Sequence, residues 1–106
     1  MTFIRKKSTT FKWPVKVNYP VDDGRFETET FDAVFKRVGR SEWTRLVDSG
    51  DTELIEAVLV GWNGVTDEAG KEIPFNSREL RSMSDDHCFT RGVIRAYLES
   101  LNDEKK

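Results

Sequence analysis

Residues 61–76 have the sequence GWNGVTDEAGKEIPFN, in which glycine-containing turns separate two apolar segments. The segment before them is apolar at helical spacing, so we expect a helix that begins at Asp51 or Thr52 and reaches Trp62. Its apolar side consists of Leu54, Ile55, Val58, Leu59 and Trp62. Two helices joined in this way around a tryptophan are typical of a small interaction module and build no catalytic pocket.

The sequence beyond these turns predicts two further helices. Residues 68–71 suggest a small hairpin, and Asn76 with Glu79 three residues later has the form of a capping box, so a short helix should follow through Met83. The last helix should be capped by Ser84 or Asp85. Its apolar stripe, which we expect to be mostly core, consists of Phe89, Val93, Ala96, Tyr97 and Leu101, widened by Ile94 and Leu98. Earlier in the chain, before the helix that begins at Asp51 or Thr52, Ser41 can cap a short helix that ends at Gly50.

The N-terminal half has the period-two pattern of strands. Apolar and polar residues alternate over 12–21, with Pro14 and Pro20 on the same parity, which predicts a strand at the border of a sheet. Asp22-Asp23-Gly24-Arg25 is a hairpin turn, and a return strand should run over 26–38. Phe26 falls on the opposite parity from Phe31 and Phe35, so we expect a bulge near residues 28–30, the alternative being an exposed Phe26. The fold class is therefore α+β: an N-terminal antiparallel β-hairpin followed by about four helices in one small domain.

Length and composition restrict the class of protein. A chain of 106 residues with a net charge of −2 suits one domain over residues 11–101 and does not suit a nucleic-acid binder. The single cysteine, Cys88, cannot form an internal disulfide, and no apolar run approaches the length of a membrane span. We therefore expect a soluble intracellular protein, with a polar tail over 102–106.

Basic residues are concentrated at the N-terminus. Residues 1–16 carry five cations and no acid, and the first ten form a basic arm. Solvated charge is the simplest interpretation, and the alternative is an arm that docks on an acidic partner. Glu27 and Glu29 share one face of the return strand, where exposed charge is again the default and contact with a basic partner the alternative.

The residues that could carry out chemistry do not combine into a site. His87 and Cys88 are adjacent in Asp85-Asp86-His87-Cys88, whereas a Cys/His nucleophile pair must face each other, and a metal would need more ligands than these. The glycines fit no phosphate-binding pattern. We expect no enzyme, no cofactor and no metal. We expect the two acids Asp85 and Asp86 to lie at a helix N-terminus, where the helix dipole favours negative charge.

Aromatic residues are the candidates for partner binding. The chain has three tryptophans and seven phenylalanines, and tryptophan is enriched at the centres of interfaces. Most of these rings should be core, but those that could remain exposed are Trp13, Phe31, Phe35 and Trp43. Apolar area left over after the core is filled would also favour self-association.

The chain resembles a family of phage proteins. The segments FKWPVKVNYPVDDGRFETETFDAVFKRV (residues 11–38), LVGWNGVTDEAGKEIPFNSREL (59–80) and RGVIRAYLESL (91–101) resemble the small tail assembly chaperones of long-tailed bacteriophages and prophages. The positions that carry the resemblance are apolar anchors and turns rather than reactive groups. The segment SMSDDHCF (82–89) departs from the family pattern, in which a shorter, more apolar link is expected.

The resemblance implies a function without catalysis. Members of this family coat the tape measure protein, keep its apolar helices soluble and recruit tail tube subunits, in the cytoplasm of the host bacterium, and are absent from the finished virion. The resemblance therefore implies that the partners are the tape measure protein, the tail tube protein and further copies of this chain, with no nucleic acid and no membrane. The competing hypotheses are a structural tail-completion or head–tail joining protein of the virion, and an unrelated regulatory or adaptor domain.

Overall fold

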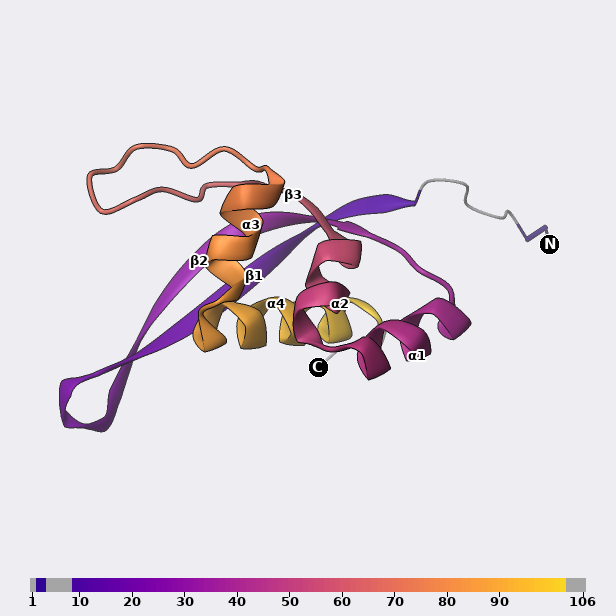
Figure 1. Ribbon diagram of the computed structural model, residues 1–106, viewed down its shortest axis with the longest axis horizontal. Coiled ribbons are helices and arrows are strands. Elements are labelled where there is room, and N and C mark those ends of the chain that lie inside the picture. Colours follow the sequence, from indigo (N-terminus) through magenta and orange to yellow (C-terminus); the bar gives the residue numbers. More distant parts are fainter. Residues whose placement is uncertain (1, 4–8, 103–106) are drawn as a thin grey trace.

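The fold combines a three-stranded antiparallel sheet with helices, as Figure 1 shows. The structure is a computed structural model that describes residues 2–3 and 9–102. Its elements, in chain order, are β1 (Thr10–Val21), a 3-10 turn (Asp22–Gly24), β2 (Arg25–Lys36), α1 (Arg40–Ser49), α2 (Asp51–Val58), β3 (Leu59–Asn63), α3 (Ser77–Ser84) and α4 (His87–Ser100). The α+β class and the N-terminal hairpin are confirmed. The expected arm (residues 1–10) and tail (residues 102–106) lie mostly outside the described residues.

The hairpin of β1 and β2 is long and continuous in register. Thr10 pairs with Lys36 and Val21 with Arg25, and no shift interrupts the ladder between them. The expected bulge near residues 28–30 is therefore wrong. The alternative holds: Phe26 stays on the outer face of the sheet and is 65% exposed.

The turn and the border position of β1 are as expected. The turn has positive φ at Asp23 (66°) and Gly24 (71°), which suits a short polar side chain and a glycine. The strand order is β1-β2-β3, so β1 lies at an edge of the sheet, where Pro14 and Pro20 remove no hydrogen bond from the ladder.

The third strand corrects the expected long helix. α2 ends at Val58, and residues 59–63 form β3, which pairs with β2 from Asp32↔Asn63 to Phe35↔Leu59. Trp62 is thus a strand residue opposite Ala33. A bulge lies in this ladder, between Val34 and Phe35 of β2.

The helices begin one or two residues away from the expected caps. Gly39 and Gly50 hold the N-cap positions of α1 and α2, in place of Ser41 and of Asp51 or Thr52. Asp86, rather than Ser84 or Asp85, caps α4 by accepting a hydrogen bond from the Cys88 N–H at 2.9 Å. The cap at Asn76 is confirmed, since its Oδ1 accepts from the Glu79 N–H at 2.8 Å.

The helices cover one face of the sheet, and α4 packs against β1 (Figure 1). The inward residues of the strands and the facing residues of α2 and α4 form one core. Its most completely buried members are Val15, Phe35, Ile55, Val58, Leu59, Phe89, Val93 and Tyr97. The contact between α4 and β1 is close at Gly92, where a Cβ atom would lie 2.6 Å from the Lys16 carbonyl oxygen.

The segment between β3 and α3 is a long loop with a small hairpin inside it. Thr66 forms an isolated bridge with Glu72, and the Asp67 N–H donates to the Lys71 carbonyl at 2.9 Å, which confirms the expected hairpin around residues 68–71. The indole Nε1–H of Trp62 donates to the Ile73 carbonyl at 2.9 Å and fixes the base of the loop to the sheet.

Candidate protein-interaction site

The aromatic side chains form two clusters. The first cluster gathers at the end of the sheet where β1 begins and surrounds Tyr97 of α4; its other members are Phe11, Trp13, Phe35 and Trp43. Trp43 stacks on Tyr97 with ring centroids 5.2 Å apart and planes 14° apart. The Tyr97 hydroxyl donates to the Lys36 carbonyl at 3.1 Å. Burial raises the pKa of Tyr97, against the opposing effects of the Val38 backbone and the Arg37 charge.

The second aromatic cluster lies at the opposite end of the helical layer. Phe31 stacks on Phe89 with centroids 5.8 Å apart, and Trp62 meets Phe31, Phe75 and Phe89 edge to face. Edge-to-face and offset pairs of this kind stabilise a core beyond the area that they bury. The two clusters account for most of the aromatic residues of the described chain.

The structure distributes the four aromatic candidates between these clusters. Phe35 has no exposed surface, so its expected role at a partner interface is wrong: the strand turns it inward against Tyr97. Trp13, Phe31 and Trp43 are half-buried, each with a face against the core. Phe31 lies away from the other two, so these residues do not form one surface.

The segment around His87 and Cys88 lies at the start of α4. His87 is exposed and Cys88 half-buried, while the preceding Asp86 is used as the helix cap. Within residues 2–3 and 9–102, no group of three or more His, Cys, Asp or Glu side chains could hold a metal ion. The acids are thus placed where a helix N-terminus favours negative charge.

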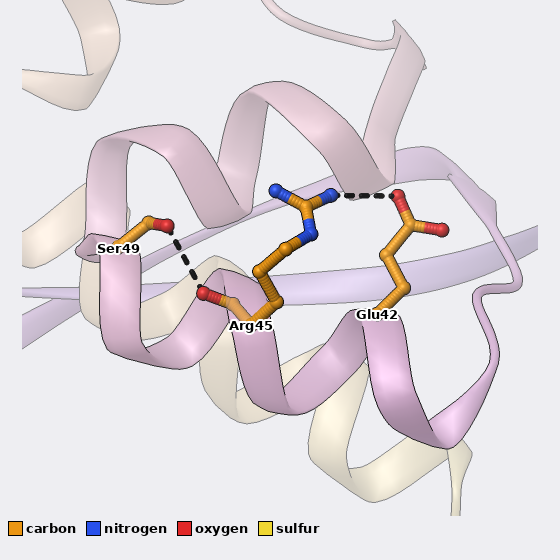
Figure 2. Close-up of polar contacts among 3 residues, drawn as sticks. All are labelled: Glu42, Arg45 and Ser49. Atoms are coloured by element: carbon orange, nitrogen blue, oxygen red, sulfur yellow. Dashed lines mark hydrogen bonds and ion pairs between the residues drawn. The ribbon is translucent and has the colours of Figure 1, made fainter.

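The outer face of α1 is polar and makes its own contacts. The Arg45 guanidinium lies 3.4 Å from the Glu42 carboxylate, and the Ser49 hydroxyl donates to the Arg45 carbonyl at 3.0 Å. Figure 2 draws both contacts. Both charged side chains are largely exposed, so this ion pair adds at most a few tenths of a kcal/mol, about the value of exposed pairs. The face offers little apolar surface to a partner.

A second apolar stripe on α4 begins at half-buried Ile94, which packs against the core, and continues to the exposed Leu98 and Leu101. Ile94, Leu98 and Leu101 follow one another at i, i+4 and i+7 and so share one side of the helix. Leu98 is 48% exposed and Leu101 is 59% exposed, whereas Val93 and Tyr97 on the adjacent side are buried. We call Ile94, Leu98 and Leu101 the outer stripe of α4.

Ile94 and Leu98 of the outer stripe line an open trough. The trough has a volume of about 800 Å³ and runs along α4 beside Asp51, the first residue of α2. Arg91, Arg95 and Glu99 of α4 form its charged border. An apolar floor with a mixed-charge border is the usual composition of a protein-interaction surface.

Comparisons with protein-family models, with characterised proteins and with solved structures found no match. In the described part of the chain no helix is long and apolar enough to cross a membrane.

The outer stripe is a site that the sequence indicated but did not assign. The apolar residues of α4 occupy two adjacent sides of the helix, which is more than one sheet face can cover. Phe89, Val93, Ala96 and Tyr97 are core, as expected, whereas Leu98 and Leu101 are exposed. The sequence signal for this site is that the apolar residues of α4 cover a wider part of the helix surface than one packed face needs.

Proposed function

We propose that this chain is a phage tail assembly chaperone that acts by binding alone, with no catalytic step. In this proposal it masks apolar helices of the tape measure protein in the bacterial cytoplasm, recruits tail tube subunits, associates with further copies of itself and is absent from the virion. The observation that carries the proposal is the outer stripe of α4, in which half-buried Ile94 is followed by the exposed Leu98 and Leu101. The resemblance of residues 11–38, 59–80 and 91–101 to this family supplies the identity of the partners.

The geometry of the outer stripe suits a helical partner. Amphipathic helices dock in apolar grooves through side chains spaced three and four residues apart. The stripe presents the complementary spacing, since Ile94, Leu98 and Leu101 span about two turns of α4. The long apolar helices of a tape measure protein would supply such anchors.

The trough is open, so a single copy should bind weakly. Many copies along one filament would still give high occupancy, because linked weak contacts raise the effective concentration of each neighbour. Weak individual contacts would also let the tail tube displace the chaperone. Masking of this kind requires no reactive group.

The proposal is tested by co-expression with the tape measure and tail tube proteins of the same genome. We expect soluble tape measure protein to co-purify with this chain and to precipitate when the chain is omitted. The variant Leu98→Ser/Leu101→Ser should lose this effect. The matched control is Phe26→Ser/Val60→Ser, which removes two exposed apolar side chains from other elements of the fold and should retain it.

Two outcomes would contradict the proposal. A tape measure protein that is equally insoluble with and without the chain would exclude the chaperone function. Detection of the chain in purified virions would instead favour a structural tail-completion or head–tail joining protein. If both double variants solubilise the tape measure equally well, the binding face is not the outer stripe.

A further inference from the structure

One edge of the sheet is left open at β2. β3 pairs with β2 only over residues 32–35, so the part of β2 from Arg25 to Phe31 has β1 on one side and no strand on the other within the described residues. The Arg37 N–H donates to the Thr9 carbonyl, and backbone groups alternate in direction along a strand. The odd-numbered residues of β2 therefore direct their backbone N–H and C=O groups toward β1, and the even-numbered residues direct theirs away from it. The backbone groups of Phe26, Thr28 and Thr30 therefore point away from β1, toward the open side.

The opposite edge of the sheet is protected. Pro14 and Pro20 are even-numbered residues of β1, whose backbone groups point away from β2. Because proline has no backbone N–H, the free edge of β1 lacks two hydrogen-bond donors. The Lys16 carbonyl on the same edge is close to Gly92 of α4. Such features prevent pairing with another chain, and the open part of β2 contains no proline.

A groove runs beside the open edge of β2. It has a volume of about 470 Å³ and lies between β2 and the first residues of the loop after β3. The core-side residues of the groove are mainly apolar: Val17, Phe31, Val65, Met83 and Phe89. Both the hairpin and the loop project to the left in Figure 1, away from the start of β1.

The charges of this groove are all of one sign. Its charged lining residues are Glu29 of β2 and Asp67 and Glu68 of the loop. Burial raises the pKa of Tyr19 in this lining, and the nearby Asp86 and Glu29 carboxylates raise it further. A ligand of this groove should therefore combine positive charge with apolar side chains and an extended backbone.

The N-terminal segment of this chain has that composition. Residues 2–9 have the sequence TFIRKKST, with three consecutive cations and no acid, and Phe3 is 89% exposed in a single copy. The whole chain has a net charge of −2, so without the five cations of residues 1–16 the remainder carries −7. The chain thus holds two complementary parts.

We propose that residues 2–9 of one copy bind in the groove beside β2 of a second copy. The backbone of the segment pairs with Phe26, Thr28 and Thr30, its cations face Glu29, Asp67 and Glu68, and its apolar residues cover the groove floor. This proposal rests on the self-association proposed above and gives it a specific mode. Pairing of this kind is strand addition to an exposed sheet edge.

The basic part of the segment cannot lie along the groove of its own chain. Thr10 pairs with Lys36, and the groove begins at the level of Val17 and Glu29, seven strand residues or about 23 Å away. The cations at residues 5–7 are three to five residues from Thr10, a span of at most about 18 Å, so their backbone stops short of the groove. The contact must therefore join two copies, with the start of one at the groove of the next.

Charge reversal with mixing tests the proposal. Variant A carries Arg5→Glu, Lys6→Glu and Lys7→Glu, and variant B carries Glu29→Lys, Asp67→Lys and Glu68→Lys. We expect the wild-type chain to associate in sedimentation velocity, less at 500 mM than at 50 mM salt, and each variant alone to associate at least about tenfold more weakly. A mixture of A and B should associate again, because acidic segments then meet basic grooves.

The controls separate charge from folding. The variant Asp32→Lys/Asp48→Lys/Glu53→Lys has the same charge change as B on exposed residues outside the groove and should associate like the wild type. Tryptophan fluorescence should show that all variants are folded. If A or B is not folded, mixing Ser8→Cys with Thr28→Cys, both in a Cys88→Ser background, gives the second readout: a mixed disulfide dimer between the two chains under oxidation.

The outcomes also distinguish this mode from the proposed function. Association that persists in A and B, with no restoration specific to the mixture, would overturn the arm-and-groove contact while leaving self-association standing. A wild-type chain that stays monomeric at high concentration would overturn both. Solubilisation of the tape measure protein is measured separately and depends on α4, so it can fail or succeed independently.

Discussion

Gly92→Ala tests how closely α4 lies on the sheet. Gly92 is buried in the middle of α4, and a Cβ atom there would lie 2.6 Å from the Lys16 carbonyl oxygen and 3.1 Å from Val17 Cγ2. The oxygen belongs to the backbone of β1, so it cannot rotate away as a side-chain atom could. A normal carbon–oxygen contact is about 3.3 Å or longer. The substitution must therefore push helix and strand apart by about 0.7 Å.

The magnitude follows from two opposing effects. Alanine in place of glycine in a helix interior stabilises by about 1 kcal/mol when nothing obstructs the methyl group. Overpacking in a closed core costs about 1–3 kcal/mol. The upper end of this overpacking cost applies here, because moving α4 away from β1 weakens the dispersion contacts of Phe89, Val93 and Ala96 together. The net effect is a loss of about 2 kcal/mol.

The assay is urea unfolding followed by tryptophan fluorescence. With a slope of about 1.3 kcal/mol/M, the unfolding midpoint should fall by about 1.5 M. Gly61→Ala is the matched control. A Cβ at Gly61 would lie 3.4 Å from Val34, which is an acceptable contact, so this substitution should change the unfolding midpoint little. A Gly92→Ala protein that is more stable than the wild type, as helix propensity alone requires, would refute the close approach of α4 to β1.

Substitutions at four further positions test single contacts, each by the urea midpoint. Trp62→Phe keeps an aromatic ring, although a smaller one, and removes the donor to the Ile73 carbonyl, so stability should fall by at least about 1 kcal/mol and protease cleavage within residues 64–76 should accelerate. Asn76→Ala should cost about 1 kcal/mol through the lost cap of α3, whereas Asn76→Asp should not. Ser84→Ala should raise stability by about 1 kcal/mol, because the Ser84 hydroxyl is buried without a hydrogen-bond partner. Burial raises the pKa of Tyr97 above its ordinary value of about 10, so the unfolded chain releases this proton first; stability should fall as pH rises above about 10, and fall less in Tyr97→Phe.

The hairpin was predictable because its signals are local. Alternation over residues 12–21 placed Val15 and Val17 on the buried face, and both are buried. Asp23 and Gly24 adopt the positive φ angles that their residue types favour. The parity of Phe26 relative to Phe31 and Phe35 in the return strand also gave its correct position, outside the core, and the bulge introduced to bury it was the mistake. One exposed phenylalanine needs no compensating irregularity.

β3 could not be predicted from local signals. Residues 54–62 are apolar almost throughout, so they satisfy the spacing of a helix and of a short buried strand equally well. The choice is made by Asp32 to Phe35 of β2, which offer a ladder to residues 59–63. Since Trp62 is held by that ladder and by the Ile73 carbonyl, its side chain is buried without being part of a helix. Tertiary pairing decided the element.

The exposed surfaces were the hardest part to predict, because exposure is a property of what the rest of the chain fails to cover. Phe35 and Leu98 are both large apolar residues in regular elements, yet one is fully buried and the other is 48% exposed. The difference arises because α4 has more apolar surface than the sheet can cover, whereas Phe35 is covered by the rings of Phe11 and Tyr97.

The two proposed surfaces use different parts of the chain, so their effects should be separable. Loss of the outer stripe of α4 removes the contact with the tape measure helix and leaves the contact between copies. Loss of the basic segment leaves each copy able to bind the tape measure helix, but removes the contact with neighbouring copies that would hold it on that helix. The contact joins an arm of one copy to a groove of the next, so unless two copies exchange arms reciprocally it extends as a ring or an open chain. An open chain of copies would repeat the outer stripe at regular intervals, which is the arrangement that a long helical partner requires.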